Sequence, residues 1–386
     1  KDPELIMKKN NNRVALRSLV GLAMVCFNVN LYAHGPNGGH FHDAVAQVDQ
    51  FKEGAIIGHG DYRYKVHQDW GKLDKEKYPI KNCHAMVQLK NGDLLALCDD
   101  NKHNFLLYSP EGELKKAWIT EYPGAHGIEV FEEDGKEFFI VVDSGWAVRK
   151  GKQYKEIGRV AKTTVDGQVV FSLGHPQTVG AYETGQRFMP CDAAVAPNGD
   201  IYVADGYASQ WVLQYDKHGR FIRKFGGGSE KDENAKLKNS HGVSVDLRDP
   251  ENPKLIVSSR AENKLKVFTM EGVFIENIDL PGAYGGQAVV HGGNLYVGVC
   301  WSKENGTGKK LKQSGFVAIL DKNNKVISCP GGNEPKYIDG LIQPMYQERK
   351  TFLHVHDVCV DKRGNIYVVQ WNSKGAYPIK LELLKL

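Results

Sequence analysis

The sequence predicts an all-β fold, a six-bladed β-propeller whose ring is closed by an N-terminal strand. One pattern recurs six times: a short apolar strand, a turn with glycine, a second strand ending in small or acidic residues, and a third strand. Four strands per repeat at a spacing of roughly 40–50 residues are typical of propeller blades. No amphipathic helix of convincing length competes with this pattern. The six repeats open at His84, His126, Cys191, His241, Gly286 and His356.

The turns inside the repeats favour hairpins. Asn91-Gly92, Asp134-Gly135 and Gly292-Gly293 each lie between apolar runs, and such dipeptides are strong hairpin signals. Third strands are predicted at 104–109, 211–215, 264–269 and 315–320. Longer connections at 163–186, 226–239 and 301–314 are predicted to be insertions between strands.

The last repeat indicates how the ring closes. It ends with its third strand, which begins at Tyr377, so one outer strand is missing. Residues 62–70 precede the first full repeat and are well placed to supply that strand. Closure would remove an exposed sheet edge that otherwise invites aggregation. We therefore predict a single six-bladed propeller over residues 56–386.

Composition and charge exclude several classes. The chain has 386 residues, 41% hydrophobic and 25% charged, which is ordinary globular material. Its net charge is +4, and residues 1–33 carry five Lys or Arg against two Asp or Glu. The remainder is nearly neutral with interspersed signs, so it lacks the basic footprint of a nucleic-acid-binding protein.

The N-terminal residues predict export. Lys8, Lys9, Arg13 and Arg17 precede a short apolar run that ends at Ala33, as in a secretory signal peptide. We expect residues 1–33 to be upstream residues plus this signal, cleavage after Ala33, and a secreted or periplasmic protein with no transmembrane segment thereafter. An uncleaved anchor is the alternative. Residues 34–55 are predicted to form a His- and Gly-rich arm, with a candidate N-terminal metal site at His34, His40 and His42.

Six cysteines remain after the predicted cleavage. An even number in an oxidising compartment permits disulfides, and six cysteines allow 15 full pairings. Cys83 and Cys98 flank the Asn91-Gly92 turn and could approach across it. Buried free thiols are equally compatible with a core of this size.

Three histidines occupy equivalent places in alternate repeats. Residues that open the second, fourth and sixth of six blades lie a third of a turn apart around the central channel. Three imidazoles converging with an open face describe a catalytic type of zinc site, which predicts a metal centre at His126, His241 and His356. The alternative is that each imidazole only forms hydrogen bonds to a neighbouring blade.

Further nitrogen and sulfur ligands open other repeats or lie nearby. His84 adds a possible fourth imidazole, and His354 shares a strand face with His356 by the period of two. Cys191 opens the third repeat. A channel mouth with these additional ligands suits copper or iron as well as zinc.

The repeats look like NHL repeats and, more narrowly, resemble the propeller of peptidyl-α-hydroxyglycine α-amidating lyase, the second half of the peptide-amidating enzymes. The resemblance is carried by CDAAVAPNGDIYVADGY from Cys191, by HGVSVD with the strand LIVSSR that follows it, and by HDVCVDKRGNIYVVQW from His356. It covers most of residues 80–386, and its specific part is the set of histidines that open alternate repeats.

The resemblance implies roles for several residues. It places a zinc ion on His126, His241 and His356. It makes Tyr207 a candidate general base and Arg260 a candidate to stabilise developing negative charge. It also matches Asp357 to a calcium-binding aspartate, with the carbonyl of Ile128 as another expected calcium ligand.

The chain departs from that family at three places. The family's arginine for the substrate carboxylate has no match, because residues 98–101 read Cys-Asp-Asp-Asn and acidic side chains would repel a carboxylate. His354 stands where the family has methionine. The family's paired cysteines around the third blade are also not reproduced, since Ala208 follows Tyr207.

Two functions follow from these observations. The first is a secreted metal-dependent lyase or hydrolase that acts on a small carbonyl, carbinolamide or peptide-derived compound. The second is a non-catalytic propeller subunit of an extracytoplasmic multi-subunit oxidoreductase, in which the insertions would bind partner subunits; fold alone does not decide between them. A ligand-binding NHL module is a third alternative.

Overall fold

The computed structural model describes residues 53–100, 102–149, 152–372, 375 and 377–384, all within one compact unit, Tyr32–Leu386. Among these residues the regular structure is β apart from two short 3₁₀ turns, η1 (Arg260–Glu262) and η2 (Glu304–Gly306), which confirms the all-β prediction. No helix in this part of the chain is long and apolar enough to cross a membrane. The predicted signal peptide and the candidate site at His34, His40 and His42 lie outside the described residues.

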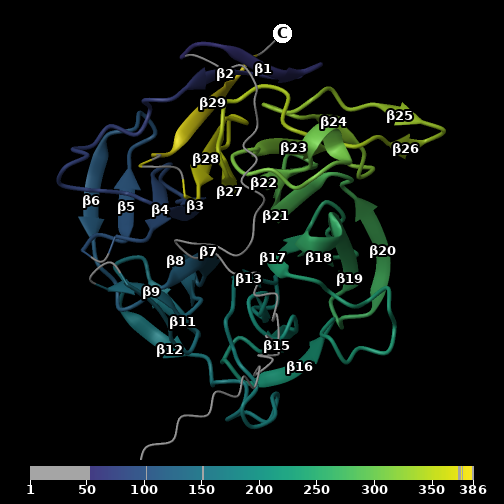
Figure 1. The fold of residues 1–386 in the computed structure, drawn as a ribbon. Coiled ribbons are helices and arrows are strands. Elements are labelled where there is room, and N and C mark those ends of the chain that lie inside the picture. Colours follow the sequence, from purple (N-terminus) through teal and green to yellow (C-terminus); the bar gives the residue numbers. More distant parts are fainter. Residues whose placement is uncertain (1–52, 101, 150–151, 373–374, 376, 385–386) are drawn as a thin grey trace, which may run out of the picture. The chain divides into compact units, whose positions relative to one another are not determined.

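Six sheets form six blades around a central axis, as predicted (Figure 1). Blade 1 consists of β3 (Cys83–Gln88), β4 (Leu94–Cys98), β5 (Phe105–Tyr108) and β6 (Leu114–Trp118). Blade 2 consists of β7 (Ala125–Glu133), β8 (Lys136–Asp143), β11 (Arg159–Thr164) and β12 (Val169–Ser172). Blade 3 consists of β13 (Asp192–Val195), β14 (Ile201–Ala204), β15 (Val212–Tyr215) and β16 (Phe221–Phe225).

The second half of the ring repeats this order. Blade 4 consists of β17 (Ser240–Asp246), β18 (Lys254–Ser259), β19 (Lys264–Thr269) and β20 (Phe274–Asp279). Blade 5 consists of β21 (Ala283–His291), β22 (Asn294–Ser302), β23 (Phe316–Leu320) and β24 (Val326–Ser328). Blade 6 has five strands in the order β27 (Val355–Val360), β28 (Ile366–Gln370), β29 (Ile379–Leu383), β2 (Tyr62–His67) and β1 (Ile56–His59).

The N-terminal strands close the ring, which confirms the prediction for residues 62–70. β2 pairs antiparallel with β29, with Val66 opposite Leu381, and β1 adds a further strand outside β2. Tyr64, Val66 and Leu381 are fully buried in one apolar cluster that reaches into blade 5. The first and last strands of the propeller are therefore held together by both hydrogen bonds and packing.

The apolar core lies between neighbouring blades. All five residues of β4 are buried, because both faces of a middle strand are covered by an adjacent sheet, which is why its sequence reads as a continuous apolar run. One cluster joins blades 3 and 4 through Tyr202, Val243 and Phe268, and another joins blades 1 and 2 through Leu97 and Phe139. The repeat pattern thus encodes two apolar faces per blade.

Two connections differ from the sequence prediction. Residues 163–172 were expected within an insertion, but most of them complete β11 and β12, because blade 2 carries its extra hairpin earlier, as β9 (Trp146–Arg149) and β10 (Lys152–Lys155). The long connection between blades 5 and 6 contains another hairpin, β25 (Tyr337–Ile338) and β26 (Leu341–Ile342), at the periphery (Figure 1).

The innermost strands position the functional side chains. β3, β7, β13, β17, β21 and β27 are each the first strand of a blade, and each contacts the next around the axis (Figure 1). Residues that start these strands therefore meet at one end of the central channel.

Candidate metal centre

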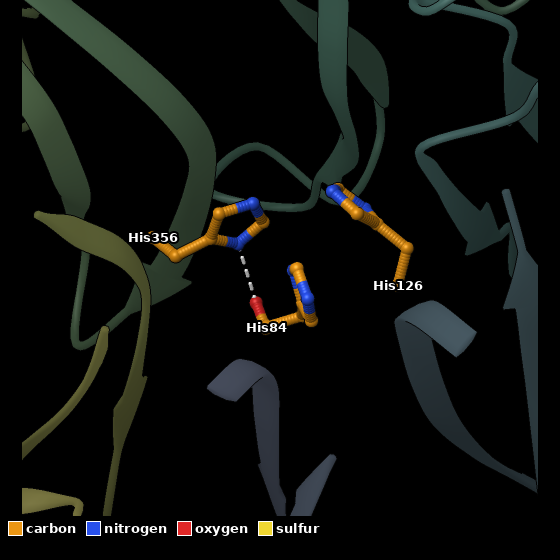
Figure 2. A group of neighbouring side chains, drawn as sticks. All are labelled: His84, His126 and His356. Atoms are coloured by element: carbon orange, nitrogen blue, oxygen red, sulfur yellow. Dashed lines mark hydrogen bonds between the residues drawn. The ribbon is translucent and has the colours of Figure 1, made fainter. Parts of the chain in front are cut away.

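Four imidazoles meet on the propeller axis. His84, His126, His241 and His356 are each the second residue of an innermost strand, in blades 1, 2, 4 and 6. The ring centroids of His126 and His356 are 4.6 Å apart, and those of His241 and His356 are 4.9 Å apart. His84 lies 4.9 Å from His126 and 4.8 Å from His356, and Figure 2 shows these three side chains converging from separate strands.

A β-bulge directs each of these side chains. Residue pairing along β3 and β4 passes from Cys83 to Ala85, so His84 is the extra residue of the bulge. The same irregularity falls at His126, His241 and His356. Because a bulge leaves one residue unpaired and re-aims its side chain, the four histidines leave the alternating pattern of their strands and face the channel.

The set of converging nitrogens differs from the predicted set. Ligand atoms of His84, His126 and His356 all lie within 4.8 Å of one another, so these three can hold a metal ion. His241, predicted as the third ligand, has its Nε2 2.9 Å from the Tyr207 hydroxyl. The structure thus brings together all three residues predicted from the threefold spacing and also His84, which the sequence offered as an additional candidate.

Hydrogen bonds to neighbouring blades fix the tautomers of two ligands. The Nδ1 of His126 donates to the carbonyl of Cys191 at 2.7 Å, and the Nδ1 of His356 donates to the carbonyl of His84 at 2.6 Å (Figure 2). A carbonyl can only accept, so each Nδ1 carries the proton and each Nε2 keeps a lone pair. These two hydrogen bonds therefore link neighbouring blades and also orient the imidazole rings as ligands.

Burial keeps the imidazoles neutral. It lowers the pKa of His126 and His356 well below the usual value, with the neighbouring imidazoles adding to the effect, and it lowers the pKa of His84 to about 4. The neutral ring is the form that binds metals. The Nδ1 of His84 is buried and has no hydrogen-bond partner among the described residues, so a cation on the axis would satisfy an atom that is otherwise unsatisfied.

The Tyr207 hydroxyl forms hydrogen bonds with two imidazoles. Its hydroxyl lies 2.8 Å from the Nε2 of His126 and 2.9 Å from the Nε2 of His241. Because the Nε2 of His126 has no proton, we assign the hydroxyl as its donor, and the Nε2 of His241 then donates to the phenolic oxygen. Burial raises the pKa of Tyr207 well above 10, whereas the Arg260 charge acts in the opposite direction.

The loop after β14 sets the position of Tyr207. A Cβ on Gly206 would lie only 2.1 Å from the carbonyl oxygen of Ser240, so only glycine fits there. The buried Asp205 carboxylate accepts hydrogen bonds from the Met189 amide at 2.7 Å and the Tyr182 hydroxyl at 2.8 Å. Sequence analysis identified the Asp-Gly-Tyr pattern by resemblance, and these contacts give its physical basis.

Arg260 stands at the first position of η1, immediately after β18. Its Nε donates to the Asn239 side-chain oxygen at 2.7 Å, and its guanidinium lies 5.0 Å from the ring centre of Trp301. Its charge contributes to the lowered pKa values of His126 and His356. Arg260 is 5% exposed and therefore supplies a buried positive charge beside Tyr207 and the imidazoles.

Carboxylates lie further along the channel. Asp192 and Asp357 line one small cavity together with the four histidines. Burial raises the pKa of Asp357 to about 7 and that of Glu129 to about 8, and it raises that of Asp192 strongly, with the other two carboxylates adding to the effect on Asp192. Each would therefore be stabilised in its charged form by a nearby cation.

The predicted calcium residues belong to this acidic part of the channel. One Asp357 oxygen accepts from the Met86 amide at 3.3 Å, while the buried Oδ1 has no hydrogen-bond partner within the described chain. Ile128, whose carbonyl is the other expected ligand, is in β7 next to Glu129 and lines a cavity of about 350 Å³. An unsatisfied carboxylate oxygen among further carboxylates fits a hard cation with oxygen ligands.

Two candidate ligands do not fit a metal centre. The Nδ1 of His354 donates to the carbonyl of Trp371 at 3.1 Å, and its Nε2 accepts from the Gln313 amide at 3.0 Å. These backbone contacts hold the ring of His354 outside the group of converging ligand atoms, which His84, His126 and His356 form.

Cys191 contributes its carbonyl rather than its thiol. Burial raises the pKa of this thiol well above 9, which disfavours the thiolate that metals bind. All six cysteines among the described residues are free and buried, including Cys83 and Cys98, which lie opposite each other in β3 and β4.

Sequence reasoning missed several residues of this region. Asp192 follows Cys191 as Asp357 follows His356, so the repeat itself offered a signal for it. Lys310 comes from the irregular connection between β22 and β23, where no periodic pattern points to it, and Trp301 lies in β22, which the sequence analysis ended before residue 301. Trp371, at the end of β28, lines the recess at the channel mouth together with His84, His126 and Tyr207.

Comparisons with solved structures show the fold. The chain superimposes on a gluconolactonase from Xanthomonas campestris with a TM-score of 0.54 at 14% identity, over 89% of this chain and 99% of that one. A streptogramin B lyase matches with a TM-score of 0.50 at 14% identity, over 83% of this chain and 98% of that one. Similarity at this level establishes a shared propeller architecture.

Comparisons of sequence support the resemblance to amidating enzymes. No protein-family model matches the chain. It is 31% identical over 78 residues, 20% of its length, to a probable peptidyl-alpha-hydroxyglycine alpha-amidating lyase from Caenorhabditis elegans. It is 24% identical over 224 residues, 50% of its length, to peptidyl-glycine alpha-amidating monooxygenase A of Xenopus laevis. The matched segments span only 22% and 23% of these two relatives. The chain is thus a six-bladed β-propeller that resembles the amidating lyases in sequence.

Proposed function

We propose that this chain is an extracytoplasmic, metal-dependent lyase that cleaves a carbinolamide into an amide and an aldehyde. The observation that carries the proposal is the convergence of buried, neutral imidazoles with Tyr207 and Arg260 at one end of the channel. The resemblance to a probable amidating lyase supplies the reaction class. The signal-like N-terminal sequence motivates the compartment.

The proposed metal ligands are His84, His126 and His356, with His241 as the neighbouring imidazole. A bound zinc, copper or iron ion would supply Lewis acidity, stabilising the negative charge that develops on the substrate oxygen. Asp357 and the Ile128 carbonyl, with Glu129 and Asp192, are proposed to hold calcium in the acidic part of the channel, where it would join blades rather than react.

The residues of the chain would move the protons of the reaction. In carbinolamide cleavage the substrate hydroxyl loses a proton while the carbon–nitrogen bond breaks, and the leaving amide nitrogen gains a proton. Tyr207, held between two imidazoles, is positioned to carry a proton between these atoms. The buried Arg260 charge favours an oxyanion in the same space.

Metal analysis and turnover together test this function. The purified full chain should carry about one equivalent of a transition metal and cleave an α-hydroxyglycine peptide. His126→Ala should remove both, whereas the exposed His218→Ala should change neither. A native chain that binds stoichiometric metal but does not cleave the compound would refute the lyase proposal.

A second candidate function is a non-catalytic subunit of an extracytoplasmic multi-subunit oxidoreductase. The observation that favours it is the β25–β26 hairpin, on which Ile338 is 59% and Leu341 70% exposed. Exposed apolar side chains on a projecting hairpin are typical of contact sites. Co-purification of partner subunits that is lost in a Leu341→Asp variant, together with absent turnover, would favour this function.

A further inference from the structure

Two cations lie over one indole beside the metal centre. The Nζ of Lys310, which follows η2 in the connection between β22 and β23, is 4.0 Å from the ring centre of Trp301 and 4.5 Å from that of Tyr284. The guanidinium carbon of Arg260 is 5.0 Å from the same Trp301 ring. The two charged groups are therefore at most about 9 Å apart.

This upper limit on the separation leaves room for one small anion between the two groups. A carboxylate that accepts a charge-assisted hydrogen bond of about 2.8 Å on each oxygen spans roughly 8 Å between its two donors. Trp301 is 3% and Arg260 5% exposed, and Lys310 is half-buried, so an anion held here would be largely withdrawn from water. Charge-assisted hydrogen bonds are stronger in such surroundings than at an exposed site.

The two positive charges oppose each other. Burial, with a contribution from the Arg260 charge, lowers the pKa of Lys310 to about 7. A bound anion would offset both effects, because an opposite charge nearby favours the protonated amine. The local electrostatics thus favour an anionic ligand over a neutral one.

The cation pair adjoins the recess that contains the metal centre. Trp301 packs against Trp371, with ring centroids 5.9 Å apart and planes at 71°. Trp371 lines the recess together with His126 and Tyr207. A ligand whose anionic group lies at Trp301 can therefore extend along the indole rings toward the imidazoles.

The opposite side of the recess has the opposite charge. Asp99, at the end of β4 in blade 1, lines this recess and accepts hydrogen bonds from the Asn82 amide at 2.9 Å and the Asn82 side chain at 2.6 Å. A carboxylate would be repelled on the blade 1 side and attracted on the side of blades 4 and 5. This distribution of charge favours the orientation in which the carboxylate of a substrate faces blades 4 and 5.

We propose that Arg260 and Lys310, over the indole of Trp301, form the carboxylate-binding subsite of the channel mouth. The ligand class is a small carboxylate with an apolar or amide-containing body that lies along Trp301 and Trp371. This subsite rests on the proposed function only in assigning the bound carboxylate to the substrate of the lyase.

Binding of an unreactive carboxylate tests the subsite separately from catalysis. Benzoylglycine and its uncharged amide, benzoylglycinamide, would be titrated into the full metal-loaded chain by calorimetry. We expect the carboxylate to bind at least about tenfold more tightly than the amide, because a charge-assisted hydrogen bond in a buried site is worth a factor of this order. Equal affinity for the two compounds would overturn the proposal.

Variants of neighbouring lysines locate the effect. Lys310→Gln should abolish the preference for the carboxylate, Lys310→Arg should retain most of it, and the exposed Lys309→Gln should leave it unchanged. A Lys310→Gln chain that keeps its native melting temperature and its full carboxylate preference would refute the assignment. If the Lys310→Gln variant still cleaves an α-hydroxyglycine peptide and keeps the carboxylate preference, the subsite is refuted and the lyase proposal stands. If the native chain prefers the carboxylate but does not cleave the peptide, the lyase proposal is refuted and the subsite stands.

Discussion

Two neighbouring groups of side chains in the central channel, called here the imidazole end and the acidic end, show pKa shifts of opposite sign from the same burial. At the imidazole end, loss of water lowers the pKa of His84, His126 and His356 and keeps them neutral. At the acidic end, it raises the pKa of Asp357 and Glu129, which also favours the neutral form. Burial thus removes charge at both ends, and the chemical difference lies in what each end offers a cation.

This difference in ligand atoms allows one channel to bind two kinds of metal ion at separate places. Neutral imidazole nitrogens suit zinc, copper or iron, whereas carboxylate and carbonyl oxygens suit calcium. The ends are separated by a single step along the inner strands, since Asp357 follows His356 directly. The following predictions test whether the two ends are chemically independent.

Removing an imidazole should have the largest effect. We expect His356→Ala to lower the affinity for a transition metal at least about 100-fold, because loss of a ligand costs more than loss of the group that orients it. Calcium affinity at the acidic end should remain within a few-fold of the native value. Titration of both metals with chelator competition would measure this, and parallel loss of both affinities would show that the ends act as one site.

Tyr207→Phe should reduce turnover while leaving metal content unchanged. We expect kcat to fall about 100-fold or more, which is the usual contribution of a positioned proton-transfer group. The phenyl ring preserves the packing against His126 and His241, with which Tyr207 is in edge contact. Single-turnover kinetics with the metal-loaded variant would measure the loss; a native rate would exclude Tyr207 from proton transfer.

Stability should depend on pH with opposite sign at the two ends. In the native state Asp357 has a pKa of about 7, above its ordinary value of about 3.8, so the folded chain binds more protons and loses stability as pH rises from about 4 to 7. His84 has a folded pKa of about 4, below 6.5, so its contribution increases as pH rises over that interval.

Calcium and a paired variant separate these contributions. At pH 8 calcium should raise the free energy of unfolding by a few kcal/mol, since a shift of one pKa unit corresponds to about 1.4 kcal/mol. At pH 5, where Asp357 is protonated, the gain should be much smaller. Urea unfolding of the native chain and Asp357→Asn would measure this, and an equal calcium effect in both chains would contradict the assignment.

His354→Gln should have the smallest effect on the metal. Because both nitrogens of His354 are bonded to backbone groups, we expect metal content and affinity to stay within about twofold of native, with a loss in stability of about 1 kcal/mol. Metal analysis and thermal unfolding would check this. Loss of the metal would restore His354 as a ligand.

Sequence reasoning predicted the propeller because hairpin turns and apolar strands report local structure six times over. It also predicted that repeat-opening histidines meet, because equivalent residues of a ring face one axis. It gave His84 only as an additional candidate, because the threefold argument used alternate repeats and His84 opens the first repeat. The bulges that redirect the histidines and the cation at Lys310 depend on irregular backbone, for which periodicity gives no signal.

The pairing of β2 with β29 has a consequence for biogenesis. β2 is synthesised early, and its partner β29 lies more than 300 residues later in the chain. A contact of such sequence separation is among the last to form. His356 belongs to the blade that this pairing completes, and His84 belongs to the next blade around the ring. Loading of the metal should therefore follow release of the finished polypeptide, so a stalled or truncated translation product would fold in part yet carry no ion.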